Sequence, residues 1–298
     1  MSFILTRGKL GDKVPHDLSI QHHMIIGEKM SAQLDYKDYS TLVISREGKV
    51  ATVSINRPDS MNSINNELHH ELSWIFGQLA DDASISVIVL TGMGKAFCAG
   101  GDLPWLEGLA NSLPTHLENI RVGQRIVMSI LECPKPIICR LNGDAIGLGA
   151  TIALLCDIII ASDTARIADP HVKIGLVAGD GGALIWPQLI GYAKAKEFLL
   201  TGNAVAAPEA ARLGLINYAV KAEELDATVD RFVDKILAAS QAAVGYTKLA
   251  INLPLRQCVH SVLEMSLAFE GLTMLQNADL KEGIKAFGER RAPKFTND

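Results

Sequence analysis

The chain has 298 residues, 48% of them hydrophobic and 20% charged, with a formal net charge of -5. A chain of this length and apolar content can bury a large core, which excludes disorder for most of it. The mildly acidic balance lacks the basic field that binding to nucleic acid or to an anionic membrane usually needs, so we expect a cytoplasmic protein with a small-molecule partner.

The cysteines indicate reduced thiols in the core. They are odd in number, lack the CxxC spacing typical of zinc sites and stand mostly among apolar residues. They are Cys98, Cys133, Cys139, Cys156 and Cys258. We therefore expect neither disulfides nor a metal site. The apolar runs have the length of strands and fall short of the roughly 20 residues of a membrane-spanning helix, so we expect no membrane segment.

The first 38 residues show no clear periodicity. Two interpretations stay open for this N-terminal arm. It is a mobile, disordered segment, or it contains an over-called start, in which case residues 1–29 do not belong to the native protein.

From Thr41 a β-β-α order is predicted. The run TLVISR, the turn at residues 47–49 and the run VATVSI read as a hairpin. Asn65 can cap a helix over residues 66–80, whose apolar residues recur at helical spacing, and VIVLT then supplies a buried strand.

A similar cycle follows and predicts an α/β core over residues 39–192. It consists of a long helix near 115–131, the strand IICRLN, a glycine-rich turn into a short helix, and the strands DIIIA and ARIAD. In the remaining region, residues 193–298, strand signals nearly vanish. Helical patterns cover residues 193–201, 208–213, 222–252 and 258–286. Apolar residues in the last of these, Leu263, Leu267, Leu272 and Leu275, predict a surface for subunit assembly.

Four segments in order carry a family resemblance. They are INRP with MNS (residues 55–63), KAFCAGGDL (95–103), NGDAIGLG continuing to CDI (142–158), and FGERR with the residues after it (287–295). Together they resemble the crotonase superfamily of enoyl-CoA hydratases and isomerases over residues 40–296. The resemblance implies a crotonase-type β-β-α spiral, with a helical C-terminal region through which family members form trimers, often paired into hexamers.

The chemistry of a thioester explains why glycines are needed in these two segments. A thioester carbonyl gains negative charge when its α-carbon becomes enolate-like, and two backbone N–H groups aimed at that oxygen stabilise it. The resemblance assigns these donors to Gly101 and Leu148, the latter at a helix N-terminus. The alternative is that both segments are structural turns.

The resemblance also assigns binding residues for coenzyme A, which is expected as part of the substrate and not as a separate cofactor. The residues near the coenzyme are Arg57, Ser63, Ala99, Gly100, Asp102, Phe287 and Arg290. Trp105 and Leu106 are assigned to the acyl pocket. The two arginines can equally be solvated charges, and the apolar residues plain core.

Neither glutamate of the usual hydratase pair is present. Thr151 and His171 stand at the two positions. Thr151 can position water or substrate but cannot take a proton near neutral pH. His171 and Asp180, nine residues on, resemble the pair of the β-diketone hydrolase (6-oxocamphor hydrolase) branch, which activates water. If His171 is the base, the rate should rise with pH near about 6.5.

The leading prediction is an enoyl-CoA hydratase/isomerase-like lyase in which His171 and Asp180 replace the two glutamates. One alternative is a hydrolase that cleaves a C–C bond of a β-diketone by a retro-Claisen reaction. Another is a catalytically silent coenzyme A binder or an RNA-binding family member. For the pair itself, His171 as a surface or helix-capping histidine and Asp180 as a helix cap stay open.

Overall fold

The computed structural model describes residues 36–275 and 278–296, within one compact unit over Gln33–Asp298. The prediction for the N-terminal arm lies outside the described residues, apart from a short 3-10 turn at Tyr36–Asp38. The predicted boundary between residues 192 and 193 stays a prediction.

The first β-β-α unit forms as its sequence predicts. Strands β1 (Leu42–Glu47) and β2 (Val50–Ile55) pair antiparallel around Gly48, whose φ of +56° suits a tight turn. Helix α1 (Asn66–Asp81) begins after Asn65, whose side-chain oxygen accepts the Leu68 N–H at 2.9 Å. Strand β3 (Val87–Gly92) then pairs parallel to β2.

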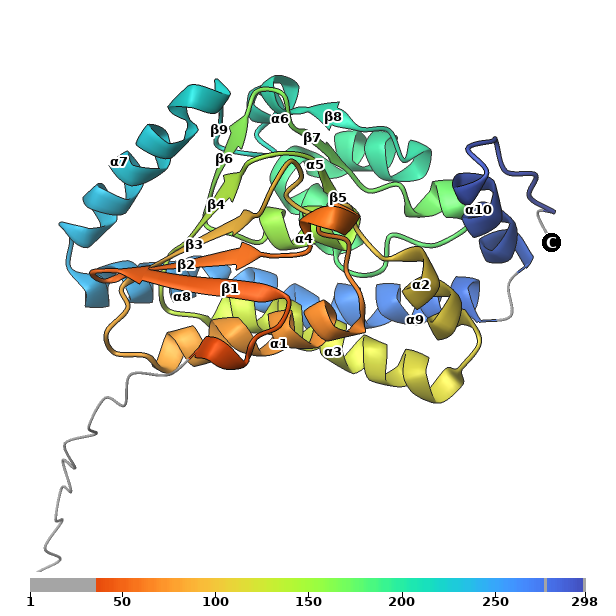
Figure 1. Cartoon of the computed structure of the whole chain (residues 1–298), viewed down its shortest axis with the longest axis horizontal. Helices are drawn as coiled ribbons and strands as arrows, with labels where there is room; N and C mark the ends of the chain where they lie inside the picture. The colour runs from red at the N-terminus through yellow and green to blue at the C-terminus, as the bar shows by residue number, and fades with distance from the viewer. Residues whose placement is uncertain (1–35, 276–277, 297–298) are drawn as a thin grey trace, which may run out of the picture. The chain divides into compact units, whose positions relative to one another are not determined.

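Two sheets organise the molecule. The larger has the strand order β1-β2-β3-β4-β6-β9, with β4 at Ile137–Leu141, β6 at Ile158–Ser162 and β9 at Tyr218–Val220. The smaller joins β5 (Ala145–Ile146), β7 (Arg166–Ala168) and β8 (Val205–Ala206). All pairs after the first hairpin in the larger sheet are parallel. The mixed α/β class and the helical C-terminal region are as predicted (Figure 1).

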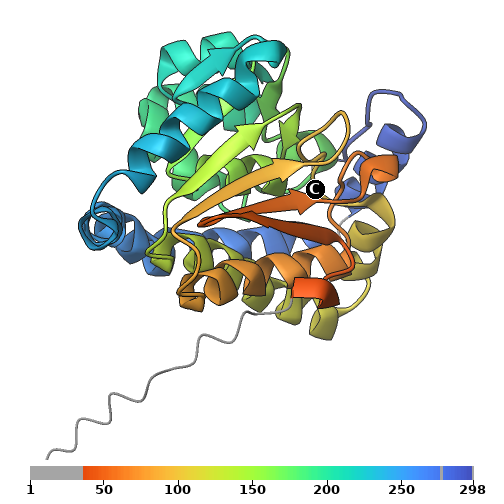
Figure 2. The ribbon, with the colours of Figure 1, turned by 60° about the vertical axis from the view of Figure 1, so that its left-hand side comes forward.

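Helices cover both faces of the larger sheet. In Figures 1 and 2, α7 lies on one face and α1 and α3 on the other. Side chains alternate along each strand: Val87, Val89 and Ile138 pack under α7, and Ile88 and Leu90 join the main core. Burial on both faces explains why these strands read as uninterrupted apolar runs.

The remaining elements connect the strands or follow them. They are η2 (Pro58–Ser60), α2 (Leu103–Ala110), α3 (Leu113–Glu132), α4 (Leu148–Leu154), η3 (His171–Ile174), α5 (Gly182–Thr201), α6 (Ala207–Leu213), η4 (Ala222–Glu224), α7 (Leu225–Leu237), α8 (Gln241–Cys258), the π turn η5 (Val259–Leu263), α9 (Glu264–Met274) and α10 (Ala278–Gly288).

Several helix boundaries differ from the prediction, and the pattern over 258–286 is divided into η5, α9 and α10. Helix α5 begins at Gly182 instead of residue 193, and Gly191, with φ +73°, kinks it where the predicted pattern starts. The pattern over 222–252 is divided into α7 and α8 because Ser240 caps a new helix, its hydroxyl accepting the Ala243 N–H at 3.4 Å.

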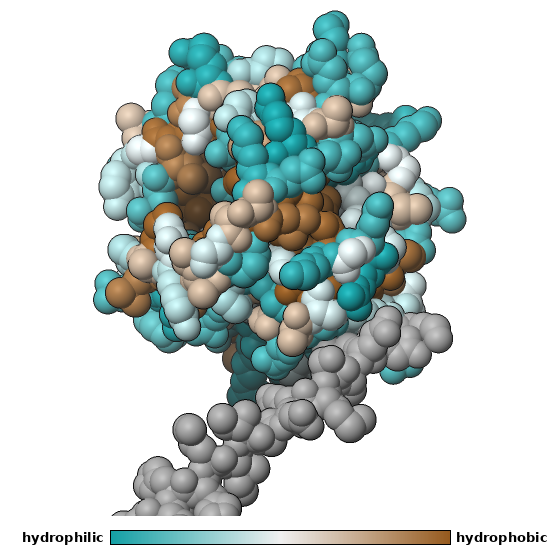
Figure 3. Space-filling view, turned by 90° about the vertical axis from the view of Figure 1, so that its left-hand side faces the viewer, coloured by the Kyte–Doolittle hydropathy of each residue, from teal (hydrophilic) through white to brown (hydrophobic). Residues whose placement is uncertain are grey.

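The predicted assembly surface is only partly exposed. Leu263 and Leu267 are buried inside the subunit, so the prediction was wrong for these two, because this side of η5 and α9 packs on the core. Leu272 is exposed, as are Met265 and Phe269 on the same helix. On the side that carries α7, hydrophilic side chains cover most of the surface and apolar ones gather in patches between them (Figure 3).

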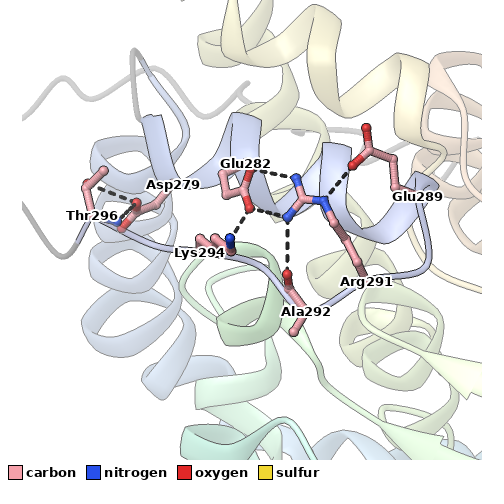
Figure 4. A network of polar contacts seen from close by, with 7 residues as sticks. All are labelled: Asp279, Glu282, Glu289, Arg291, Ala292, Lys294 and Thr296. Atoms are coloured by element: carbon pink, nitrogen blue, oxygen red, sulfur yellow. Dashed lines mark hydrogen bonds and ion pairs between the residues drawn. The ribbon is translucent and has the colours of Figure 1, made fainter.

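An ion-pair network holds the C-terminal segment on α10 (Figure 4). The Arg291 guanidinium donates to Glu282 (Nη2 to Oε2, 2.9 Å) and to Glu289. Its hydrogen bond lowers the pKa of Glu282 to about 2. The segment that resembled the family's C-terminal motif therefore folds back on its own helix.

Among the helices that the structure describes, no single one is long and apolar enough to cross a membrane. One bent pair, Gln241–Met274 with Ala278–Gly288, is long and apolar enough only if its two parts are counted together, across a bend of 79°.

Candidate active site

The two glycine-rich segments meet at one edge of the cavity described below. The Ile146 N–H donates to the Cys98 carbonyl at 2.9 Å, which fixes one segment against the other. Gly100 has φ +84°, and a Cβ added there would lie 3.0 Å from the Ile146 oxygen. A Cβ on Gly149 would lie 2.7 Å from the Cys98 side chain. Only glycine allows this close approach of the two backbones.

Two backbone N–H groups remain unpaired where these segments meet. Within residues 36–275 and 278–296, neither the Gly101 nor the Leu148 N–H donates to a protein acceptor. Leu148 is the first residue of α4, so its N–H is one of the donors that a helix leaves free, and the helix dipole adds positive potential. Both residues line the same cavity. These two N–H groups can donate hydrogen bonds to a thioester oxygen that gains negative charge.

A cavity of about 450 Å³ collects most of the predicted residues. The ones that line it are Ser63, Ala99, Gly100, Gly101, Asp102, Trp105, Leu106, Leu148, His171, Asp180 and Phe287. Three others are not among its lining residues: Thr151, Arg57 and Arg290. A cavity of this size, with mostly apolar walls and a few polar groups, is typical of small-molecule sites.

His171 lies between two carboxylates. Its Nδ1 is hydrogen-bonded to Asp169 Oδ1, and its Nε2 lies 3.4 Å from Asp180 Oδ2. A Cβ added at Gly147 would lie 3.4 Å from the His171 Cε1, so the ring lies beside the segment that carries the Leu148 N–H. His171 is therefore neither a surface residue nor a helix cap.

The charge of His171 follows from these contacts. Burial alone lowers the pKa of its imidazole, but Asp169 and Asp180 outweigh burial and raise the pKa well above its ordinary value. At neutral pH the ring is therefore an imidazolium held between two carboxylates.

Asp180 is not a helix cap, because Gly181 holds that position before α5 and no side chain caps it. The Thr151 hydroxyl donates to Asp180 Oδ1 at 3.4 Å. Gly181 has φ +126°, and a Cβ there would lie 2.4 Å from the Thr151 methyl group. Thr151 is completely buried and lies outside the cavity lining, and its hydroxyl helps to hold the Asp180 carboxylate in place.

Two acidic residues of this site were missed from the sequence. Asp169 is 1% exposed and orients His171, and a Cβ on Gly182 would lie 1.9 Å from its Oδ2. Its position two residues before His171 was an available signal. Glu270, on α9, also lines the cavity. It is far from His171 in the sequence, and no local pattern indicates that it belongs to the site.

Glu270 is a buried acid in the protonated form. Burial, with a smaller contribution from the Asp180 charge, raises its pKa to about 8. The carboxyl group lies against Gly179, one residue before Asp180: a Cβ there would lie 2.7 Å from the Glu270 Oε2. The cavity therefore contains a neutral carboxylic acid near the His171 and Asp180 pair.

Asp169, His171 and Asp180 have ligand atoms within 4.8 Å of one another, a spacing that could also hold a metal ion. Both nitrogens of the ring already face carboxylates in the structure. A histidine binds a metal only as the neutral imidazole, through a ring nitrogen that no other group occupies. Two carboxylates, one at each ring nitrogen, stabilise the imidazolium instead, so we read the cluster as an ion-pair network.

Arg57 is engaged within the protein. Its guanidinium lies 3.3 Å from Asp102 Oδ2 and donates to the backbone oxygen of Ser63. Three of the residues assigned to coenzyme A thus form one network, and two of them, Ser63 and Asp102, line the cavity. Arg290 is exposed and has a left-handed backbone, with φ +53°.

Comparisons with known proteins identify the family. The family model for enoyl-CoA hydratase/isomerase matches residues 45–298. A short-chain-enoyl-CoA hydratase from Clostridium acetobutylicum is 34% identical over 85% of this chain and 97% of its own length. An (E)-benzylidenesuccinyl-CoA hydratase from Thauera aromatica is 39% identical over 86% of this chain and 98% of its own.

Similar structures are also known. The crystal structure of an enoyl-CoA hydratase/isomerase from Mycobacterium paratuberculosis superposes with a TM-score of 0.80 at 36% identity. The superposition covers 83% of this chain and 99% of that one.

Proposed function

Since this chain belongs to the enoyl-CoA hydratase/isomerase family, we propose that it adds water to the double bond of an enoyl-CoA thioester, using His171 and Asp180 in place of two glutamates. The observation that carries the proposal is the imidazole of His171 between Asp169 and Asp180, in the cavity that the free Gly101 and Leu148 N–H groups also line.

The chemistry assigns one step to each group. The thioester oxygen accepts hydrogen bonds from Gly101 and Leu148, which draws electrons from the double bond. Asp180 takes a proton from water while the His171 imidazolium stabilises the pair, and the resulting hydroxide adds to the β-carbon. The electron pair of the double bond moves to the enolate oxygen. Glu270 then donates its proton to the α-carbon while the enolate oxygen re-forms the thioester carbonyl. The proton taken up by Asp180 returns to Glu270 through solvent before the next turnover.

The protonated state of His171 changes the expected pH dependence. An imidazole that is already protonated cannot act as a base near about pH 6.5, so the rise predicted there does not hold. We expect the rate instead to fall as pH rises through about 8, because Glu270 then loses the proton that it must donate. Initial rates between neutral and alkaline pH check this. Glu264→Gln, an exposed acid on the same helix, should keep the profile, and a rate that rises steadily above pH 8 would contradict Glu270 as the donor.

Binding of coenzyme A thioesters tests the function itself. Isothermal titration with acetyl-CoA and a short enoyl-CoA should give saturable heat, and the enoyl-CoA should be consumed with formation of a hydroxyacyl-CoA. Heat without turnover would favour the silent coenzyme A binder. No heat with either thioester in folded protein would remove the proposal.

A second candidate is retro-Claisen hydrolysis of a β-diketone, which the same His171 and Asp180 pair favours through its resemblance to the diketone-hydrolysing branch. The retained AGGD segment, with its free Gly101 N–H in the cavity, supports the thioester instead. Cyclic β-diketones belong in the same assay, with products identified by mass.

We also propose that the chain assembles as a trimer or a dimer of trimers. The exposed apolar residues Met265, Phe269 and Leu272 on α9, with Tyr246 and Ile251 on α8, support an interface in the helical region. Sedimentation at micromolar concentration should give a mass above that of the 32.1 kDa chain, and a stable monomer would contradict the proposal.

A further inference from the structure

The cavity has a second group of polar residues that the proposed reaction does not use. His69 on α1, Trp105 on α2 and Asn119 on α3 all line it. Three helices therefore bring polar atoms to one wall of a cavity whose nearby lining is otherwise apolar, with Leu106, Leu109 and Met274.

These polar atoms have no partner in the protein. Among the described residues, the Trp105 Nε1 and the Asn119 Oδ1 are buried without a hydrogen bond. His69 is 2% exposed, and its ring makes no hydrogen bond within the same part of the chain. The His69 and Trp105 rings lie 5.0 Å apart between centroids, at an angle of 55°. Buried polar atoms in native proteins nearly always have a partner, so the two unpartnered atoms of Trp105 and Asn119 at one cavity wall, beside the His69 ring, indicate a ligand that supplies it.

The group is electrically neutral. Burial lowers the pKa of His69 to about 3, and the charges of His70 and Arg125 act in the same direction. Arg125 itself lies over the Trp74 ring, 4.7 Å from its centroid, and pairs with Glu118 at 3.4 Å. The wall therefore offers the Trp105 N–H as a donor, and the amide and imidazole as donors or acceptors. No lysine or arginine of the described residues lines the cavity, so a ligand carboxylate at this wall would lack a paired cation, and burial of such a charge is costly.

We propose that His69, Trp105 and Asn119 recognise an uncharged hydroxyl or carbonyl group on the acyl part of the thioester substrate. This inference rests on the proposed function, because it places the acyl group in the same cavity as His171. A plain alkyl chain would leave the Trp105 Nε1 and Asn119 Oδ1 atoms unpaired, whereas a hydroxyl or carbonyl oxygen satisfies at least one of them.

The test compares matched substrates. A panel of straight-chain and aryl 2-enoyl-CoAs is assayed, each beside its hydroxy, oxo and carboxy counterparts. We expect at least one hydroxy or oxo member to exceed its parent in kcat/KM on the order of 10-fold, the effect of one hydrogen bond to a buried partner. Trp105→Phe and Asn119→Leu should each bring that ratio towards one. Trp74→Phe, an exposed tryptophan on α1, should keep the ratio of the unmodified protein.

The outcomes separate this inference from the proposed function. If plain enoyl-CoAs are turned over and no hydroxy or oxo counterpart is preferred, the recognition group is wrong and the hydratase function stands. A preference for the carboxy member overturns the neutral character of the group. If no thioester binds or reacts, both proposals fall. The ratio in the unmodified protein decides the question even if one of the two variants does not fold.

Discussion

Replacement of His171 by alanine is expected to lower kcat/KM on the enoyl-CoA substrate by roughly 100- to 10,000-fold, because it disables Asp180, and one positioned acid–base group usually contributes that much. The alanine removes the cation between Asp169 and Asp180. That cation keeps Asp180 ionised beside a second carboxylate, and only the ionised form can accept a proton. Steady-state kinetics with the best substrate of the panel measure the loss.

The neighbouring substitutions sharpen this test. Asp180→Asn keeps the shape but cannot accept the proton, so its loss should be comparable. Thr151→Ala removes only the 3.4 Å hydrogen bond that supports Asp180 and should cost far less. His70→Ala, on α1, is the matched control for a histidine outside the cavity. If His171→Ala retains nearly full activity, the imidazolium has no part in proton transfer and another arrangement must activate water.

The second large effect is on stability, at an ion pair away from the cavity in which the lysine side chain is 6% and the aspartate side chain 21% exposed. The Lys248 ammonium on α8 lies 2.7 Å from Asp157 Oδ2 and donates to the Lys135 carbonyl at 3.0 Å. Asp157 also accepts the Ile137 N–H at 2.7 Å. Lys248→Met should lower the free energy of unfolding by about 3–5 kcal/mol, because it leaves the carboxylate buried without its cation.

Denaturant unfolding measures this change. The double variant Asp157→Asn with Lys248→Met should recover part of the loss, since it removes the unpaired charge. Lys194→Met breaks the exposed pair of Lys194 with Glu197 and is the matched control, with an expected change within about 1 kcal/mol. Unfolding of Lys248→Met at the same denaturant concentration as the parent would show that the pair contributes nothing. The family resemblance had marked Asp157 only as part of a motif, and the structure shows that it joins β4 to α8.

Local patterns predicted the elements whose signal lies within the element itself. The hairpin at β1 and β2, the Asn65 cap of α1 and the strand β3 follow from alternation, capping and apolar runs over a few residues. Strands β8 and β9 escaped, because two or three residues carry no period and their pairing partners lie far away in the chain.

The sequence by itself determined the glycine-rich segments, the absence of the usual glutamates and the candidacy of His171 and Asp180, because each of these depends on residue identity at short spacing. The tertiary structure decided how that pair is charged. The imidazolium of His171 and the neutral acid of Glu270 depend on burial and on distances between α9 and the two loops beside His171. The pKa of a group is set by the charges and the solvent within a few ångströms of it, and only folding brings those neighbours together.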